Sequence, residues 1–141
     1  MVNIIISSDP RYEINRESIR EAVMDVVAEN KISSRVELGV NIVGVRKIHE
    51  LNRKYRGIDA PTDILSFALE EVAPLNLRFI ATQKGFVASP DRMLRLGDIV
   101  ISHPQAVEDA VMDGISVEEE MVFLIKHGMK HLLGIHHDEG Y

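Results

Sequence analysis

Two hydrophobic periodicities alternate along this chain of 141 residues, and they restrict it to folds that pack helices on a sheet. Across Val36–Val43 apolar residues alternate with polar or small ones, which is the period of a half-buried strand. Across Ile19–Val27 they recur every three or four residues, as in an amphipathic helix. The pattern predicts an α+β fold: one domain over residues 1–141, with a central mixed sheet of about four strands and helices packed on it.

The boundaries follow from the same patterns and from capping residues. Asn15 and Ser116 are expected helix N-caps, and Ser116 with Glu119 forms a capping-box sequence. Gly97 and Asp98 read as a turn, and residues 70–96 read as a loop, with a hairpin around Lys84 and Gly85 as an alternative within it. The expected strands are Ile4–Ile6, Val36–Val43, Asp63–Leu69 and Ile99–Ile101, and the other expected helices are Arg46–Tyr55 and Pro104–Asp113.

Composition limits the available chemistry. The chain has no cysteine, so any metal must be held by His, Asp or Glu. The net charge of −6 argues against a protein that coats nucleic acid by bulk electrostatics, although a local basic patch remains compatible with it. No apolar run reaches the roughly 20 residues of a membrane span, and the first residues do not resemble a signal peptide. We therefore expect a cytoplasmic protein without a membrane partner.

The segment HGMKHLLGIHH, residues 127–137, is the strongest indication of a metal site. His127 and His131 lie one helical turn apart, so both rings can reach one ion. Gly134 can adopt a left-handed conformation that ends the helix and lets His137 return as a third ligand. Three imidazoles leave one position open, which is typical of a catalytic zinc site at the end of the last long helix. The adjacent His136 is an alternative to His137.

A structural interpretation competes with this one. His127 and His131 share a helix face with apolar residues, so both could be buried core histidines. The spacing also matches that of metzincin proteases, but Gly128 occupies the place of their general-base Glu. The added Gly and third His favour metal binding over the core interpretation.

A basic cluster precedes a Pro-Thr-Asp sequence in the middle of the chain. Five cations lie within eleven residues, and they could contact phosphates or simply be a solvated helix face. Thr62 and Asp63, after Pro61, could turn or cap the chain. The five cations are Arg46, Lys47, Arg53, Lys54 and Arg56.

Together these segments resemble the YbeY family of bacterial rRNA maturation endoribonucleases. The family motif HGxLHLxGxDH is similar to HGMKHLLGIHH here, and LNxxYRxxDxPTDVLSF is similar to LNRKYRGIDAPTDILSF at residues 51–67. LGDI at residues 96–99 also matches. The chain differs in having His136 and Lys130 where the family usually has Asp and Leu.

The resemblance implies one zinc ion per chain, held by His127, His131 and His137, with Arg56 near the metal and Arg56 and His127 in catalytic roles. It implies a single-strand-specific endoribonuclease that processes the 3′ end of 16S rRNA and acts in ribosome assembly or quality control. The implied partners are rRNA and the small ribosomal subunit, with ribosomal proteins and an assembly GTPase as further candidates and DNA excluded. The alternatives are a non-catalytic assembly factor that binds small-subunit rRNA and a metal-dependent hydrolase of another substrate, such as a peptide.

Overall fold

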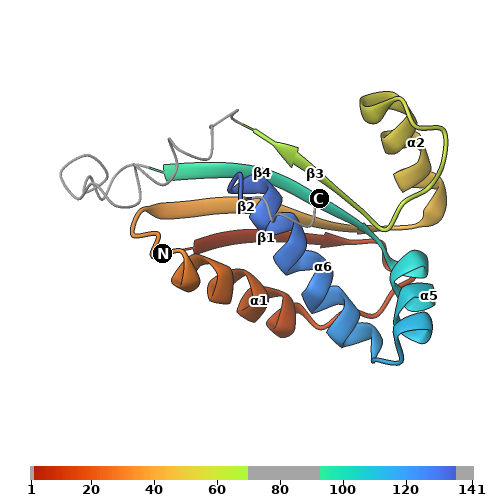
Figure 1. Ribbon diagram of the computed structural model, residues 1–141, viewed down its shortest axis with the longest axis horizontal. Helices are drawn as coiled ribbons and strands as arrows, with labels where there is room; N and C mark the ends of the chain where they lie inside the picture. The colour runs from red at the N-terminus through yellow and green to blue at the C-terminus, as the bar shows by residue number, and fades with distance from the viewer. Residues whose placement is uncertain (1, 70–92, 136–141) are drawn as a thin grey trace.

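The computed structural model describes residues 2–69 and 93–135, and all structural statements below concern these residues. Helices and strands are interleaved as expected from the sequence, although β3 is followed by β4 and α5 by α6 (Figure 1). The strands are β1 (Val2–Ser8), β2 (Arg35–Val43), β3 (Ile64–Ala68) and β4 (Met93–Ser102). The helices are α1 (Arg16–Glu29), α2 (Val45–Arg56), α5 (His103–Asp113) and α6 (Val117–Leu132).

The four strands form one sheet in the order β1-β2-β4-β3. β1 pairs with β2, and β2 with β4, in parallel, whereas β3 pairs with β4 in antiparallel orientation. The predicted mixed sheet is therefore confirmed. β3 lies at one edge of the sheet, so residues that reach this edge from either face can meet there.

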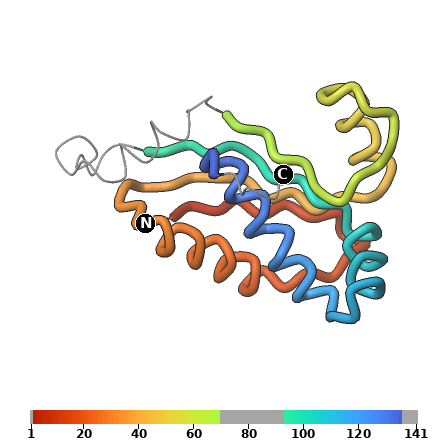
Figure 2. Tube along the Cα trace, viewed as in Figure 1, coloured from red at the N-terminus to blue at the C-terminus, as the bar shows by residue number. Residues whose placement is uncertain are grey.

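Each face of the sheet is covered by different helices. α1 and α6 lie side by side across one face, and α6 crosses β3 and β4 diagonally (Figures 1 and 2). The main core lies between these helices and the sheet and contains Val23, Leu38, Ile99 and Leu124. On the opposite face, α2 packs mainly on β3 and β4, with Ile48 of α2 against Leu65 and Val100. Burial of apolar side chains on both faces fixes the layer order.

The expected caps position the helices. Asn15 Oδ1 accepts a hydrogen bond from the Ser18 backbone N–H at 3.1 Å. Ser116 Oγ accepts from the Glu119 N–H at 3.0 Å, while the Glu119 carboxylate accepts from the Ser116 N–H at 3.1 Å. The predicted capping box is thus confirmed, and it sets the first turn of the helix that carries His127 and His131.

The expected turn at Gly97 and Asp98 is wrong, because both residues lie inside β4. The strand changes register against β2 between Glu37 and Leu38, which marks an irregularity in the pairing. Gly97 has φ +125°, and a Cβ at this position would lie 2.0 Å from the Phe67 carbonyl oxygen. A glycine that permits such a kink resembles a turn residue in the sequence, although the strand continues through it.

Part of the expected loop over residues 70–96 is also corrected, because residues 93–96 belong to β4. Residues 70–92, including the hairpin considered around Lys84 and Gly85, lie outside the described residues. Within the described part of the chain, no helix is long and apolar enough to cross a membrane.

Candidate active site

Two histidines project from the last turns of α6. The His127 and His131 rings have centroids 4.7 Å apart and planes inclined by 56°. Both side chains are partly exposed, whereas Leu124 and Met129 on the adjoining face of the helix are buried. The interpretation of the pair as buried core histidines therefore does not hold. The pair lies at the border between the core and solvent, where a ligand can reach it.

Gly128 brings this part of α6 close to the sheet. A Cβ at this position would lie 3.0 Å from Ile64 Cδ1 and 3.1 Å from the Ile99 side chain. Gly128 stands where metzincins carry their general-base Glu, and in this structure it has a packing role. A side chain here would push α6 away from β3, and the histidines beside it would move too.

The basic cluster is arranged by a buried asparagine. Asn52, which is 2% exposed, donates a hydrogen bond from Nδ2 to the Ala60 carbonyl oxygen at 2.8 Å. The Ile58 N–H also donates to the Asn52 carbonyl oxygen at 3.3 Å. Gly57 ends α2 in a left-handed conformation with φ +70°. These contacts fold residues 57–63 back along α2, so that Arg56 and the start of β3 face the same space.

The two predicted clusters meet in a single pocket of about 410 Å³. One wall comes from α6, and the others come from the end of α2 and from β3 with the residues before it. The lining residues are Arg56, Thr62, Asp63, Ile64, Leu65, Ser66, His127 and His131. Tertiary structure thus brings Arg56 together with two histidines that are more than 70 residues away in the sequence.

The predicted third metal ligand lies outside the described residues, as does its alternative, His136. Before it, α6 ends at Leu132 and Gly134 takes a left-handed conformation with φ +71°. This confirms the expected turn, although not the return of His137 to the site. Among residues 2–69 and 93–135, no group of three His, Asp or Glu side chains is arranged to hold a metal.

The imidazole rings of His127 and His131 are suited to be two of the ligands of a metal ion. Two imidazole rings lie side by side on one helix face, partly exposed and bordering a polar pocket. Imidazole nitrogen is a preferred ligand of zinc and of several other divalent transition metals. The pair supplies two ligands of such a site, and a third has to come from another part of the chain.

Asp63, expected from the sequence to lie in a turn or at the start of a strand, also lines the pocket. Burial and the neighbouring Asp109 carboxyl raise the pKa of Asp63 above its ordinary value. Asp109 comes from α5, which places a second carboxyl behind the pocket wall. The sequence signal for this role was the position of Asp63 in the Pro-Thr-Asp sequence of the motif at residues 51–67.

A second pair of carboxyls lies near the first. Glu120 of α6 is only 3% exposed, and its Oε1 has no hydrogen-bond partner among the described residues. Burial and the Asp113 carboxyl raise the pKa of Glu120 to about 7, with further contributions from Asp109 and Asp63. Carboxyls this close cannot all ionise easily, so Glu120 keeps its proton to a higher pH than an ordinary glutamate does.

The remaining described histidines lie outside the pocket. His49 Nε2 lies 2.7 Å from an Asp59 carboxylate oxygen, which ties the start of the returning loop to α2. His103 stacks on Tyr12 with ring centroids 4.7 Å apart.

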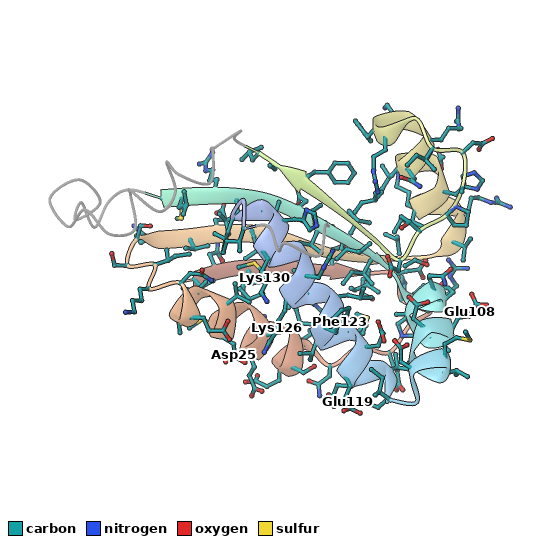
Figure 3. All side chains as sticks on the ribbon, viewed as in Figure 1. Asp25, Glu108, Glu119, Phe123, Lys126 and Lys130 are labelled. Atoms are coloured by element: carbon teal, nitrogen blue, oxygen red, sulfur yellow. The ribbon has the colours of Figure 1, made fainter. Side chains whose placement is uncertain are left out.

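On α6, the Phe123 ring lies in line with the two histidines, 6.3 Å from the His127 ring, and Phe123 is 55% exposed. Lys126 pairs with Asp25 of α1 at 3.3 Å (Figure 3).

Comparison with known proteins gives consistent results. The family profile described as "Endoribonuclease YbeY" matches residues 5–140. A protein named Endoribonuclease YbeY from Dehalococcoides mccartyi strain CBDB1 is 37% identical over 138 residues, which cover 98% of this chain and 81% of that protein. One of the same name from Moorella thermoacetica is 40% identical over 121 residues, covering 86% of this chain and 72% of the relative.

A solved structure has a similar fold. The solution structure of TM1509 from Thermotoga maritima aligns with a TM-score of 0.57 and 23% identity. The alignment covers 98% of this chain and 79% of that protein. It supports the assignment of the layered architecture around the pocket.

Proposed function

This chain belongs to the YbeY family of endoribonucleases, and on that premise we propose that it is a metal-dependent hydrolase of single-stranded RNA. The observation that carries the proposal is the pocket in which Arg56 faces His127 and His131. A guanidinium and two imidazoles, brought together from distant segments, suit a phosphodiester substrate better than a neutral one.

We assign His127, His131 and His137 as ligands of one zinc ion. A zinc ion held by these residues would supply Lewis-acid polarisation of a phosphoryl oxygen and would lower the pKa of a coordinated water toward about 7. Two imidazole donors with the described placement support this assignment.

The residues of the chain then have separate tasks. Arg56 binds the scissile phosphate and neutralises the negative charge that grows on it in the transition state. The carboxyl of Asp63, which holds a proton more tightly than an ordinary aspartic acid, can exchange protons with the reacting groups. Gly128 and Asn52 are positioning residues. Gly128 lets α6 pack against β3, and Asn52 holds the segment that follows Arg56.

The packing of Gly128 disfavours the alternative of a metzincin-like peptidase. The place where those enzymes carry a glutamate is closed here by Ile64 and Ile99.

The cellular role that we assign to this protein is cytoplasmic processing of small-subunit rRNA, including the 3′ end of 16S rRNA. The small ribosomal subunit, its proteins and an assembly GTPase are the corresponding partners.

Cleavage of small-subunit rRNA fragments tests the proposal directly. The purified protein is compared with chelator-treated protein and with the variants His131→Ala and Arg56→Ala, and bound metal is quantified in each. We expect chelation and His131→Ala to remove metal and cleavage together. Arg56→Ala should keep the metal and lose turnover by about 100-fold or more, as expected when a charged group that stabilises a transition state is removed.

His103→Ala is the matched histidine control, because His103 lies outside the pocket. It should keep both metal and cleavage. Metal bound at one ion per chain without cleavage of any RNA would refute the nuclease and favour an assembly factor. Full turnover in Arg56→Ala would remove Arg56 from the mechanism.

A further inference from the structure

One side of the pocket continues into a basic helix. α2 carries five Lys and Arg side chains and a single acidic residue, Glu50. All five cations are exposed. Of these, Arg56 lines the pocket itself, and Arg53 and Lys54 lie in the same last turn of α2. We call Arg53, Lys54 and Arg56 the basic arm.

The other side of the pocket is acidic. Asp63 lines it, Asp109 lies beside Asp63, and Asp113 and Glu120 continue the same cluster on α5 and α6. We call these four residues the acidic wall. Residues 103–125, which form α5 and most of α6, contain six carboxylates and no lysine or arginine.

Among the described residues of α5 and α6, the only lysine or arginine side chains are Lys126 and Lys130. The first lysine of α6, Lys126, points toward α1, where it pairs with Asp25 (Figure 3). Glu108 adds a further carboxylate on the outer side of α5 (Figure 3). Arg56 and Asp63 both line the pocket, and α2, which carries the basic arm, and α5, which carries Asp109 and Asp113, lie on either side of the start of β3 (Figure 1). The pocket therefore lies between a basic and an acidic surface.

RNA carries one negative charge per nucleotide, so this boundary acts differently on the two flanks of a bound strand. Phosphates on the α2 side can displace counterions by contacting the basic arm, which strengthens binding. Phosphates on the α5 side approach the exposed carboxylate of Asp113 and the partly exposed Asp63 and Asp109, which repel them, whereas Glu120 is buried. The two sides of the scissile phosphate cannot contribute equally to binding.

We propose that the enzyme grips RNA on one flank only: the strand runs from the pocket along α2, and the acidic wall leaves the opposite flank unbound. The inference rests on the proposed function and specifies its substrate. Such an enzyme selects a linkage whose flank on one side is long and single-stranded, while the other flank can be short.

Neutral phosphate analogues test the asymmetry. Once the cleaved linkage of a short RNA is mapped, two versions are made with methylphosphonates on one flank or on the other. The fully charged RNA and both versions are then compared by KM. For one version, loss of two contacted phosphates should raise KM and lower the slope of log KM against log salt by about 1.4, so that over a fourfold rise in salt its KM increases about sevenfold less than that of the charged RNA. The other version should bind as well as the charged RNA or better.

Charge variants identify which protein surface contacts which flank of the bound RNA. Arg53→Ala/Lys54→Ala should lower the slope of log KM against log salt by about 1.4 and remove the penalty of the first methylphosphonate version. Asp113→Asn should instead strengthen binding of charged RNA by roughly twofold at low salt, because a repulsive surface charge is lost. The matched controls are Arg20→Ala/Lys126→Ala for the basic arm and Glu21→Gln for the acidic wall. Their changed residues lie on α1 or on the side of α6 that faces α1, so KM should stay unchanged.

The outcomes separate the inference from the function. If the wild-type protein cleaves RNA but both methylphosphonate versions lose affinity equally, the nuclease stands and the one-flank grip is refuted. Weaker RNA binding in Asp113→Asn would also refute it, since the acidic wall would then attract the strand through cations. Failure of the wild-type protein to cleave any RNA would refute the proposed function, and the inference with it.

Discussion

The buried carboxyl of Glu120 should make the stability of this protein fall as pH rises toward neutrality. Its pKa is raised to about 7 by burial and by Asp113, whereas an ordinary glutamate has a value of 4.5. Between these two values the folded state binds more protons than the unfolded state, so the free energy of unfolding decreases with increasing pH. The contribution is fully present below about pH 4.5 and lost above about pH 7.

Replacement by glutamine isolates this effect. A shift from 4.5 to about 7 corresponds to at most about 3.5 kcal/mol, at about 1.4 kcal/mol per pKa unit. Because the other carboxyls of the acidic wall readjust, we expect Glu120→Gln to stabilise the protein by about 1 to 3 kcal/mol at pH 8 and to have little effect at pH 4.5. The side-chain amide can also donate to the neighbouring Asp113, which a carboxylate cannot do.

Urea denaturation at several pH values measures the difference. Glu108→Gln is the control, since it makes the same chemical change at an exposed position of α5. The Glu108→Gln curve should run parallel to that of the wild-type protein, while the Glu120→Gln curve should lose its slope between pH 4.5 and 7. A stability difference for Glu120→Gln that is equal at pH 4.5 and pH 8 would refute the reasoning.

Two further predictions concern residues that position the site. Asn52→Ala removes the buried hydrogen bond to the Ala60 carbonyl and should lower the free energy of unfolding, measured by urea denaturation, by about 1 to 3 kcal/mol. It should also lower cleavage while leaving bound metal unchanged. Normal activity would show that Arg56 is placed without this contact. Gly128→Val forces side-chain atoms into Ile64 and Ile99 and should destabilise the protein by about 1 to 3 kcal/mol with loss of bound metal. The control Lys126→Ala should change neither stability nor bound metal. Metal bound at wild-type levels by Gly128→Val would contradict the positioning role of this glycine.

Much of the architecture was predictable because it depends on local periodicity. The alternation in Val36–Val43 and the helical repeat in Ile19–Val27 identified β2 and α1, and the caps Asn15 and Ser116 fixed where two helices begin. β4 was underestimated because Gly97 combines a positive φ with continued strand pairing, and a glycine read alone cannot distinguish a kinked strand from a turn.

The sequence by itself determined the chemical inventory of this protein: two histidines one turn apart, a glycine that ends their helix, and a basic segment before Pro61. Those features depend on residue type and helical spacing, which are local properties. Tertiary structure decided which of them meet. Close packing of Gly128 against β3 and the Asn52 contact that folds back residues 57–63 bring Arg56 and His127 to one pocket.

The acidic wall could only be seen in three dimensions. Asp63, Asp109, Asp113 and Glu120 are scattered over three segments and look like ordinary solvated carboxylates in the sequence. Their proximity results from the packing of α5 and α6 beside the start of β3. Burial and mutual repulsion depend on distance and solvent exposure, and neither is encoded in local sequence patterns.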